Sequence, residues 1–251
     1  MSYIAVSVIT FCLIFGAGLL GMRLRKLLPE DHLSDNSKDV VKLGMGLVGT
    51  MTALVLGLLI ASAQESYDAQ SSALLQMSAK VISLDRTLAL YGPEAKEPRA
   101  VLHDEVVHII ERLWPKQMSQ MARLAPTGGL SGALYDSIEG LSPKDDRQRL
   151  LRSEGLNLAT EIGQSRWLMF EQGTLMVSKP LVAVVVFWLT FIFLSWGLFA
   201  PVNGTVISTF FIAAVSVSAA IFLVQEMYMP YAGIIRISSI PLRAALSQLG
   251  R

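Results

Sequence analysis

The sequence predicts an all-α integral membrane protein with four transmembrane helices and a long helical soluble domain between the second and third of them. The chain is 52% hydrophobic and only 16% charged, and its mean hydropathy is +0.49, whereas a soluble domain carries roughly 25% charged residues. The apolar residues gather in four runs without any charged residue, at 4–22, 43–63, 181–199 and 204–224. Each run has about the 20 residues that a helix needs to cross a hydrocarbon core of roughly 30 Å.

These runs divide the chain into four parts. We expect a first transmembrane hairpin at residues 1–63, a helical extramembrane domain at 64–179, a second transmembrane hairpin at 180–225 and an amphipathic C-terminal segment at 226–251. Backbone groups in lipid must be satisfied within their own segment, so each run should be a helix. The first run is not expected to be a cleaved signal peptide, because no basic residue precedes it and Arg23, Arg25 and Lys26 follow it.

A heptad pattern follows the second run without a break. Apolar residues recur every seven positions on two interleaved series, which is typical of a coiled-coil-like seam. We expect this seam to take part in assembly, through Tyr67, Leu74, Met77, Val81, Leu84 and Leu88. No Gly or Pro interrupts residues 65–91, so one helix should run from about Val40 to Tyr91 and end at Gly92 and Pro93.

The rest of the domain should also be helical. We expect a helix at 98–114, a loop at 125–132 and a helix that begins with Ser142 as its cap and Pro143 in its first turn. That last helix should continue into the third span with a kink at Pro180. In the C-terminal segment, Ile234, Ile237, Leu242 and Leu246 are expected to face inward and Arg236 and Arg243 to face lipid headgroups.

The stretch KLGMGLVGTM, residues 42–51, has the G-x-G-x-x-G spacing of dinucleotide-binding turns. That turn needs a buried strand before it and a soluble βαβ unit around it, but polar residues precede this stretch and a transmembrane run follows it. A different pattern fits better, because small residues recur every fourth position and so form one stripe on the second transmembrane helix. Such stripes allow close packing of helices in lipid, so we assign helix packing to Gly49, Ala53, Gly57 and Ala61.

The same helix also has features of a pore lining. If several copies surround an axis, hydroxyl groups could line the passage and apolar residues could form a constriction that gates by dewetting. Hydroxyl groups in membrane helices also commonly bond to their own helix, which leaves a structural explanation open. The pore-lining candidates are Thr50, Thr52, Leu54, Leu58 and Ser62.

The sequence gives little support for metal binding, catalysis, nucleic-acid binding or proton-coupled transport. Glu105 and His108 have the Glu-x-x-His spacing of di-iron bundles, but the second such pair and the further glutamates are missing, so we expect no metal site and no cofactor. No nucleophile motif is present, and we expect no catalytic residues and no enzyme. A net charge of +1 gives no reason to expect nucleic acid as a partner. The four runs contain no acid or base, which argues against a proton-coupled transporter.

Two segments carry a resemblance to a known family. MYMPYAGIIRISSIPLRAAL (residues 227–246) and YDAQSSALLQMSAKVISLDRTLALYGPEA (residues 67–95) resemble the bestrophin-like membrane proteins, a domain family of unknown function related to the bestrophin anion channels. The resemblance implies a pentamer, a pore lined by the second span, inorganic anions as the permeating ions and a cytoplasmic helical domain. The sequence departs from the bestrophins in having no aromatic residue at 43–63 and only Glu226 in place of an acidic cluster after the last span.

Two functions are favoured over a transporter, which is the least favoured of three. The first is a homo-oligomeric, anion-conducting channel in the lipid bilayer, and the second is a membrane-anchored structural or partner-binding helical protein without conduction. We expect the protein in the bacterial inner membrane. The basic residues of loop 23–42 weakly favour a cytoplasmic location for that loop, but the charge difference is small, so we follow the family layout and expect the 64–179 domain in the cytoplasm.

Overall fold

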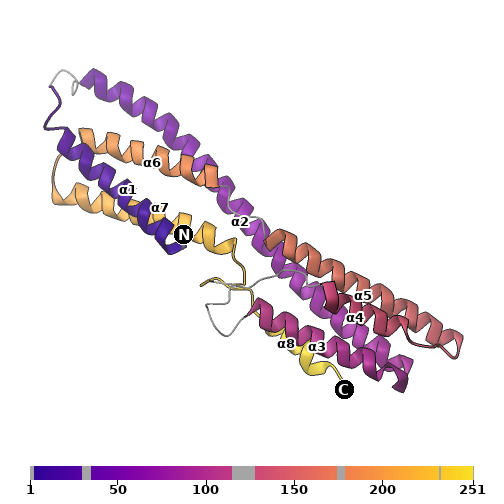
Figure 1. Ribbon diagram of the computed structural model, residues 1–251. Helices are drawn as coiled ribbons and strands as arrows, with labels where there is room; N and C mark the ends of the chain where they lie inside the picture. Colours follow the sequence, from indigo (N-terminus) through magenta and orange to yellow (C-terminus); the bar gives the residue numbers. More distant parts are fainter. Residues whose placement is uncertain (1–2, 30–34, 115–127, 174–178, 232, 251) are drawn as a thin grey trace. The chain divides into compact units, whose positions relative to one another are not determined.

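The computed structural model describes residues 3–29, 35–114, 128–173, 179–231 and 233–250, and the regular elements of these residues are all helices (Figure 1). They form two compact units. Unit 1 comprises Met1–Glu65 and Met176–Tyr228, and unit 2 comprises Ser66–Leu175 and Met229–Arg251. The boundary between the units falls within the second helix, α2 (Asp35–Tyr91).

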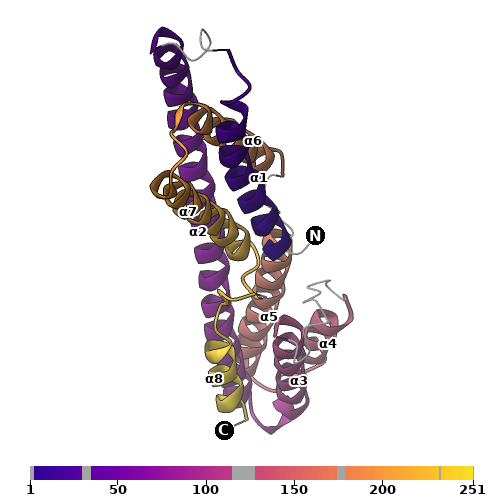
Figure 2. The same ribbon diagram turned by 90° about the vertical axis from the view of Figure 1, so that its left-hand side faces the viewer.

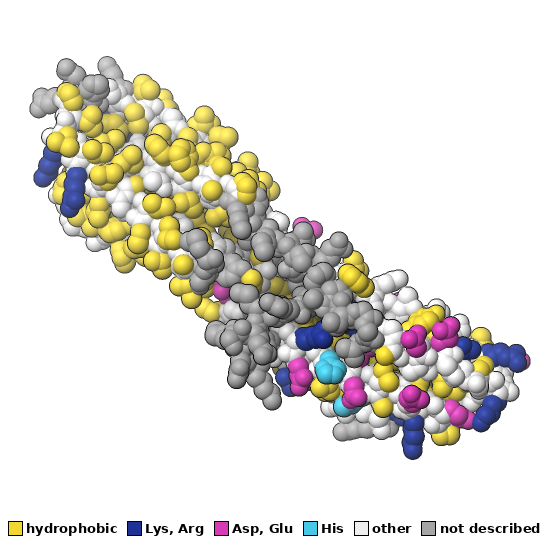
Figure 3. All heavy atoms as spheres, viewed as in Figure 1, with side chains coloured by type: hydrophobic (Ala, Val, Ile, Leu, Met, Phe, Trp, Pro, Cys, Tyr) yellow, Lys and Arg dark blue, Asp and Glu magenta, His cyan; other side chains and the backbone are white. Residues whose placement is uncertain are grey.

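Unit 1 contains α1 (Tyr3–Leu24), the first part of α2, α6 (Lys179–Phe199) and α7 (Gly204–Met227). Among the described residues, these are the four helices that are long and apolar enough to cross a membrane. The all-helical class is therefore confirmed for the described residues, and each of the four predicted spans coincides with a candidate membrane-spanning helix. The side chains of unit 1 that Figure 3 shows are mostly hydrophobic, whereas acidic, basic and histidine side chains gather on unit 2.

Glycines bring α1 and α6 into close contact. α1 packs against both α6 and α7, and Figures 1 and 2 show it beside them from two directions. A Cβ atom added to Gly21 would meet backbone atoms of α6, including the Leu198 nitrogen at 2.9 Å and the Gly197 carbonyl carbon at 3.0 Å. A Cβ added to Gly197 would in turn meet the Gly18 carbonyl carbon at 3.1 Å. Glycine is therefore required where the two backbones touch. The sequence predicted such a packing role for the small residues of α2, not for these glycines of α1 and α6.

Two polar contacts fix the ends of helices in unit 1. Arg25 Nη1 donates a hydrogen bond of 2.8 Å to the Ala200 carbonyl oxygen and so ties the end of α1 to the end of α6. The Asn203 side-chain oxygen accepts a hydrogen bond of 2.8 Å from the Val206 amide, which caps the first turn of α7. Both contacts lie at the same end of the unit.

Unit 2 is built from the second part of α2, η2 (Pro93–Ala95), α3 (Lys96–Leu113), α4 (Gly128–Glu139), α5 (Asp146–Gly173) and α8 (Ile240–Gln248). The long helix ends as predicted, because α2 stops at Tyr91 and Gly92 takes a φ of 126° that favours glycine. The Gln148 amide of α5 donates to the Tyr91 carbonyl oxygen at 3.0 Å. Lys144 donates to the Glu94 carboxylate, and this hydrogen bond lowers the pKa of Glu94.

Two details of unit 2 differ from the prediction. The predicted loop at 125–132 lies partly outside the described residues, but α4 begins at Gly128, because Leu134 and Ile138 bury their side chains in the core and so stabilise a helix that its glycines disfavour. The helix predicted to begin at Ser142 instead begins at Asp146. The Asp145 carboxylate accepts a hydrogen bond of 2.7 Å from the Gln148 amide nitrogen and takes the capping role.

The C-terminal segment packs on unit 2. Leu242 and Ala245 of α8 are fully buried, and α8 contacts α3. The Trp114 indole nitrogen donates to the Ile237 carbonyl oxygen at 3.0 Å, and its ring meets Tyr231 edge-on. Burial raises the pKa of Tyr231. The prediction holds for Ile237 and Leu242, which are buried, but not for Ile234, which is 77% exposed.

Two ion pairs lie inside unit 2. Arg99 donates from Nε and Nη2 to the two carboxylate oxygens of Asp85, at 2.7 and 3.0 Å. Arg166 of α5 donates to Glu105 of α3, and these side chains are only 16% and 3% exposed. The loss of one partner of a buried pair leaves the other charge without compensation, which costs far more than the loss of an exposed pair.

We therefore expect Glu105→Ala to lower the free energy of unfolding of the protein by about 3–5 kcal/mol, because the buried Arg166 loses the carboxylate that it contacts. The matched control is Glu161→Ala, which removes the 3.2 Å contact with Lys80 at a site where Glu161 is 51% exposed. The control should cost less than about 1 kcal/mol. Chemical denaturation of purified protein, followed by circular dichroism, measures both values, and equal losses would contradict the assignment.

The glycine contact in unit 1 gives a second prediction. Gly21→Ala should destabilise the transmembrane bundle by about 1–3 kcal/mol or more, because the new methyl group meets α6 backbone that has no room to move. Gly16→Ala is the control on the same helix, since a Cβ there meets nothing within 4 Å. Thermal unfolding in detergent, followed by size-exclusion chromatography, should show a lowered Tm for Gly21→Ala alone. A normal Tm would mean that α1 and α6 are not held this closely.

Candidate functional site

In unit 1, α2 has one face buried against its own bundle. Thr52 is 4% exposed, Leu59 is 6% exposed and Ala63 is fully buried. Met45, Val48 and Val55 are partly buried and pack on the same core. These positions are separated by three or four residues, so at 100° per residue they form one stripe along the helix. This stripe attaches α2 to the bundle.

The opposite face of α2 is uncovered. Leu47, Leu54 and Leu58 are 65%, 66% and 62% exposed, and Thr50 and Ser62 are exposed as well. These five residues also repeat every three or four positions, and they point away from the stripe that packs on the bundle. We call them the open face of α2. Four of the predicted pore-lining candidates lie on it: Thr50, Leu54, Leu58 and Ser62.

The structure separates Thr52 from these four. Its hydroxyl donates a hydrogen bond of 2.7 Å to the Val48 carbonyl oxygen, on the buried side of the helix. Residues two positions apart on an α-helix are rotated by about 200° around its axis, so Thr50 and Thr52 lie on opposite faces. The sequence shows two hydroxyls close together, but only the contacts with α1, α6 and α7 decide which one is covered. Thr52 is therefore left out of the open face.

The hydroxyl groups on the open face have defined partners. Thr50 Oγ1 donates to the Leu47 carbonyl oxygen at 2.7 Å, so its proton is engaged within the helix. Its oxygen keeps lone pairs that accept hydrogen bonds or coordinate a cation. Ser62 Oγ lies 3.1 Å from Tyr228 Oη, and either group can be the donor. This contact ties the end of the open face to the end of α7.

The small residues predicted to pack helices border the open face. Ala53, Gly57 and Ala61 are exposed and Gly49 is half-buried. A Cβ atom added to Gly49 or Gly57 would meet nothing within 4 Å, and the same is true at Gly44 and Gly46. The described part of this chain therefore offers no helix against which this stripe packs. A packing role for the stripe remains a prediction, and it requires a second copy or another chain.

The heptad residues of α2 have an intramolecular role. Leu74, Met77, Val81, Leu84 and Leu88 are at most 1% exposed, and Tyr67 packs against the same core. This core also includes residues of α3, α4, α5 and α8. The seam is thus filled by helices of its own chain. A role of these residues in assembly remains a prediction, and assembly through α2 would have to use its exposed face instead.

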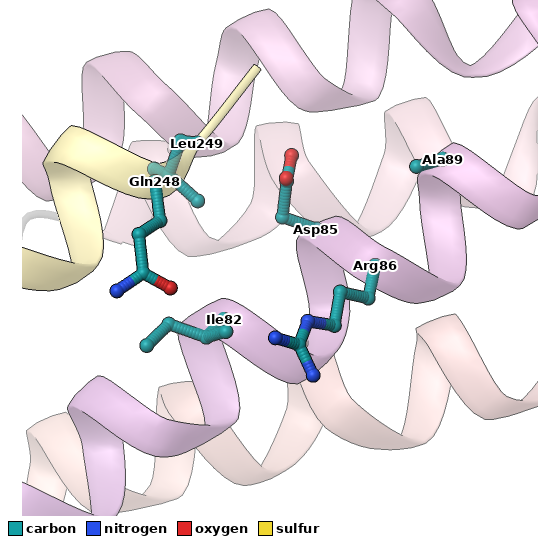
Figure 4. Close-up of a pocket in the computed structure, with 6 residues that line it drawn as sticks. All are labelled: Ile82, Asp85, Arg86, Ala89, Gln248 and Leu249. Carbon is teal, nitrogen blue, oxygen red and sulfur yellow. The ribbon is translucent and has the colours of Figure 1, made fainter. Parts of the chain in front are cut away.

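A small pocket lies in unit 2 between α2 and the end of α8 (Figure 4). Its volume is about 210 Å³, and it is lined by Ile82, Asp85, Arg86, Ala89, Gln248 and Leu249. Pockets for small-molecule ligands usually have roughly 300–1,000 Å³. The Asp85 carboxylate already accepts hydrogen bonds from Nε and Nη2 of Arg99. Its role is therefore structural, and we assign no ligand to this pocket.

The described residues offer no constellation for metal binding. No group of three or more His, Cys, Asp and Glu side chains comes together among them. Glu105, which forms the Glu-x-x-His pair with His108, is 2% exposed and bound to Arg166, so its carboxylate serves the ion pair. The open face of α2 is therefore the candidate functional site.

These features define a helical membrane protein with four candidate spans, in which α2 leaves a face with hydroxyl groups, leucines and bordering glycines uncovered. The family model of the Bestrophin-like domain matches residues 7–242, nearly the whole chain, and the chain belongs to this family. The predicted resemblance is therefore confirmed. Comparison with curated proteins and with solved structures found no match.

Proposed function

We propose that this protein is a homo-oligomeric ion channel of the membrane whose pore is lined by the open face of α2. The observation that carries this proposal is that the transmembrane part of α2 buries one face in its own bundle and leaves Thr50, Leu54, Leu58 and Ser62 uncovered. A channel needs such a surface, with hydroxyl groups that a permeating ion contacts and an apolar constriction that gates it.

The number of glycines with open space around them distinguishes α2 from the other spans, which have at most one each. The exposed faces of α1 and α6 carry bulky apolar side chains such as Ile4 and Phe187, which suit contact with lipid tails, whereas α7 also exposes the hydroxyls of Thr209 and Ser216. α2 instead combines its exposed leucines with four glycines that have open space around them. Small residues allow neighbouring helices to approach closely, so copies of α2 can stand near enough to enclose a narrow axis.

Membership in the family supports oligomerisation and the layout of the assembly. By that relationship we propose a pentamer in the bacterial inner membrane with the helical residues between α2 and α6 forming a cytoplasmic domain. The bestrophins conduct anions, and the anion expectation for this chain rests on that kinship alone.

A second function has one observation in its favour. Unit 2 exposes apolar side chains, including Leu150 at 72% and Trp167 at 59%, which suits a membrane-anchored protein that binds a partner without conducting ions. The two functions differ in the solvent around α2. A channel requires water along the open face, whereas an anchor requires only lipid or protein there.

Substituted-cysteine accessibility tests the proposed pore. In a Cys12→Ser background, which removes the exposed native thiol, Leu58→Cys should react with a membrane-impermeant charged methanethiosulfonate reagent in liposomes. Phe187→Cys is the matched control, because Phe187 of α6 is exposed to a similar extent, 58% against 62% for Leu58, and should face lipid. Mass spectrometry gives the modified fraction, and equal protection of both thiols would contradict an aqueous pore along α2.

Planar bilayers with the purified protein test conduction itself. Wild-type protein should conduct, and Gly57→Leu should abolish assembly or conductance, because a large side chain enters the stripe that borders the open face. Current recording and size-exclusion chromatography check the two effects separately. The channel is refuted if the wild type conducts no ion at any voltage or pH. Unchanged assembly and conductance in Gly57→Leu would mean that the stripe faces lipid.

A further inference from the structure

The open face of α2 carries no positive charge over the span. Residues 43–64 contain no charged side chain, and the first charged residue beyond them is Glu65, which is exposed. At the other end of the span, Lys38 and Lys42 lie on the first turns of α2. They contact Asp35 at 2.9 Å and Asp39 at 3.6 Å, so each basic residue is accompanied by an acidic one. The unbalanced charge on this part of α2 is therefore the carboxylate of Glu65.

Glu65 lies in register with the open face. It follows Ser62 by three residues and Leu58 by seven. Seven residues rotate about 20° short of two full turns of an α-helix, so Glu65 lies on nearly the same side as Leu58. At about 1.5 Å per residue, its Cα lies only about 10 Å along the helix from that of Leu58. Glu65 is the last residue of unit 1, so this register depends on one continuous helix within a single unit. Its carboxylate stands at the end of the span on the same side as the pore candidates.

The hydroxyl of Thr50 on the open face also favours a cation. An anion is bound by N–H and O–H donors, whereas a cation is bound by oxygen lone pairs. The Thr50 proton is already donated to the Leu47 carbonyl oxygen at 2.7 Å, so this side chain presents lone pairs rather than a donor to the open face. This observation is independent of the charge at Glu65.

We propose that the pore selects cations, and that Glu65 from each copy forms a ring of carboxylates at one mouth. This inference rests on the channel proposed above and names the ion class that it passes. Rings of Asp or Glu side chains are a recurrent basis of cation selectivity, as rings of Arg or Lys are for anions. The inference departs from the anion conduction that kinship with the bestrophins implies.

Apart from Lys38 and Lys42, the basic residues of unit 1 lie on or just after α1 and at the start of α6, whose first residue is Lys179. Arg23, Arg25 and Lys26 are at the end of α1, which packs on α6 and α7, and Arg25 is bound to the Ala200 carbonyl oxygen. They follow α1 rather than continue the open face of α2. Exposed charges are screened over roughly 8 Å at physiological ionic strength, so a carboxylate in the mouth acts on a permeating ion more strongly than a cation beside it.

Reversal potentials test the inference with the full-length protein in planar bilayers under a KCl gradient. The wild type should give a reversal potential near that of potassium, with a permeability to K⁺ several-fold above that to Cl⁻. Glu65→Gln, which removes the charge and keeps the shape, should shift the potential towards zero, and Glu65→Lys should shift it towards chloride. Glu65→Asp should retain the preference, and Glu154→Gln is the control for an exposed carboxylate on α5 of unit 2.

The outcomes separate this inference from the channel itself. Conductance with a preference for Cl⁻ in the wild type would overturn cation selection and leave the channel standing. A preference for K⁺ that Glu65→Gln and Glu65→Lys leave unchanged, with the oligomer intact by size-exclusion chromatography, would overturn the carboxylate ring. Absence of conductance for every ion would overturn the channel, and this inference with it.

Discussion

The way α2 divides its side chains between two faces determines what the rest of this protein can do. In unit 1, Thr52, Leu59 and Ala63 hold the helix to its own bundle, so the residues half a turn away point outward. In water such an apolar face would have to be buried, but in lipid it has no hydrophobic reason to find a partner. The open face can therefore stay uncovered by its own chain and remain available to line a pore between copies.

Glycine residues have two different structural settings in unit 1. At Gly21 and Gly197 it removes the Cβ atoms that would keep α1 and α6 apart, and backbone meets backbone. At Gly49 and Gly57 nothing lies within 4 Å of where a Cβ would be, so no contact in this chain explains the missing side chain. The first group holds the bundle together from within, whereas a packing role of the second group stays a prediction that requires a neighbour beyond the described part of this chain. A sequence pattern of small residues does not distinguish the two cases.

Sequence alone predicts most of this fold because lipid allows few solutions. The four spans, the end of α2 at Tyr91 and the buried face of its heptads all follow from apolar periodicity and from Gly92. The start of α5 and the helix α4 do not, since they depend on the Asp145 cap and on the burial of Leu134 and Ile138 by other elements. The candidate site is predicted in part for the same reason. Periodicity puts Thr50 and Thr52 on opposite faces, but only contacts with the other helices show that Thr52 is the covered one.

Family membership and local charge answer different questions about this chain. The match over residues 7–242 shows the family, and many substitutions on an exposed face leave the layout of the helices unchanged. Ion selection depends on a few side chains in the pore, which a family can alter without cost to its fold. Residues 43–63 have no aromatic residue, the Thr50 proton is engaged within the helix, and Glu65 follows as the first charge. Kinship therefore supports a channel, while the chemistry of α2 itself decides which ion would enter it.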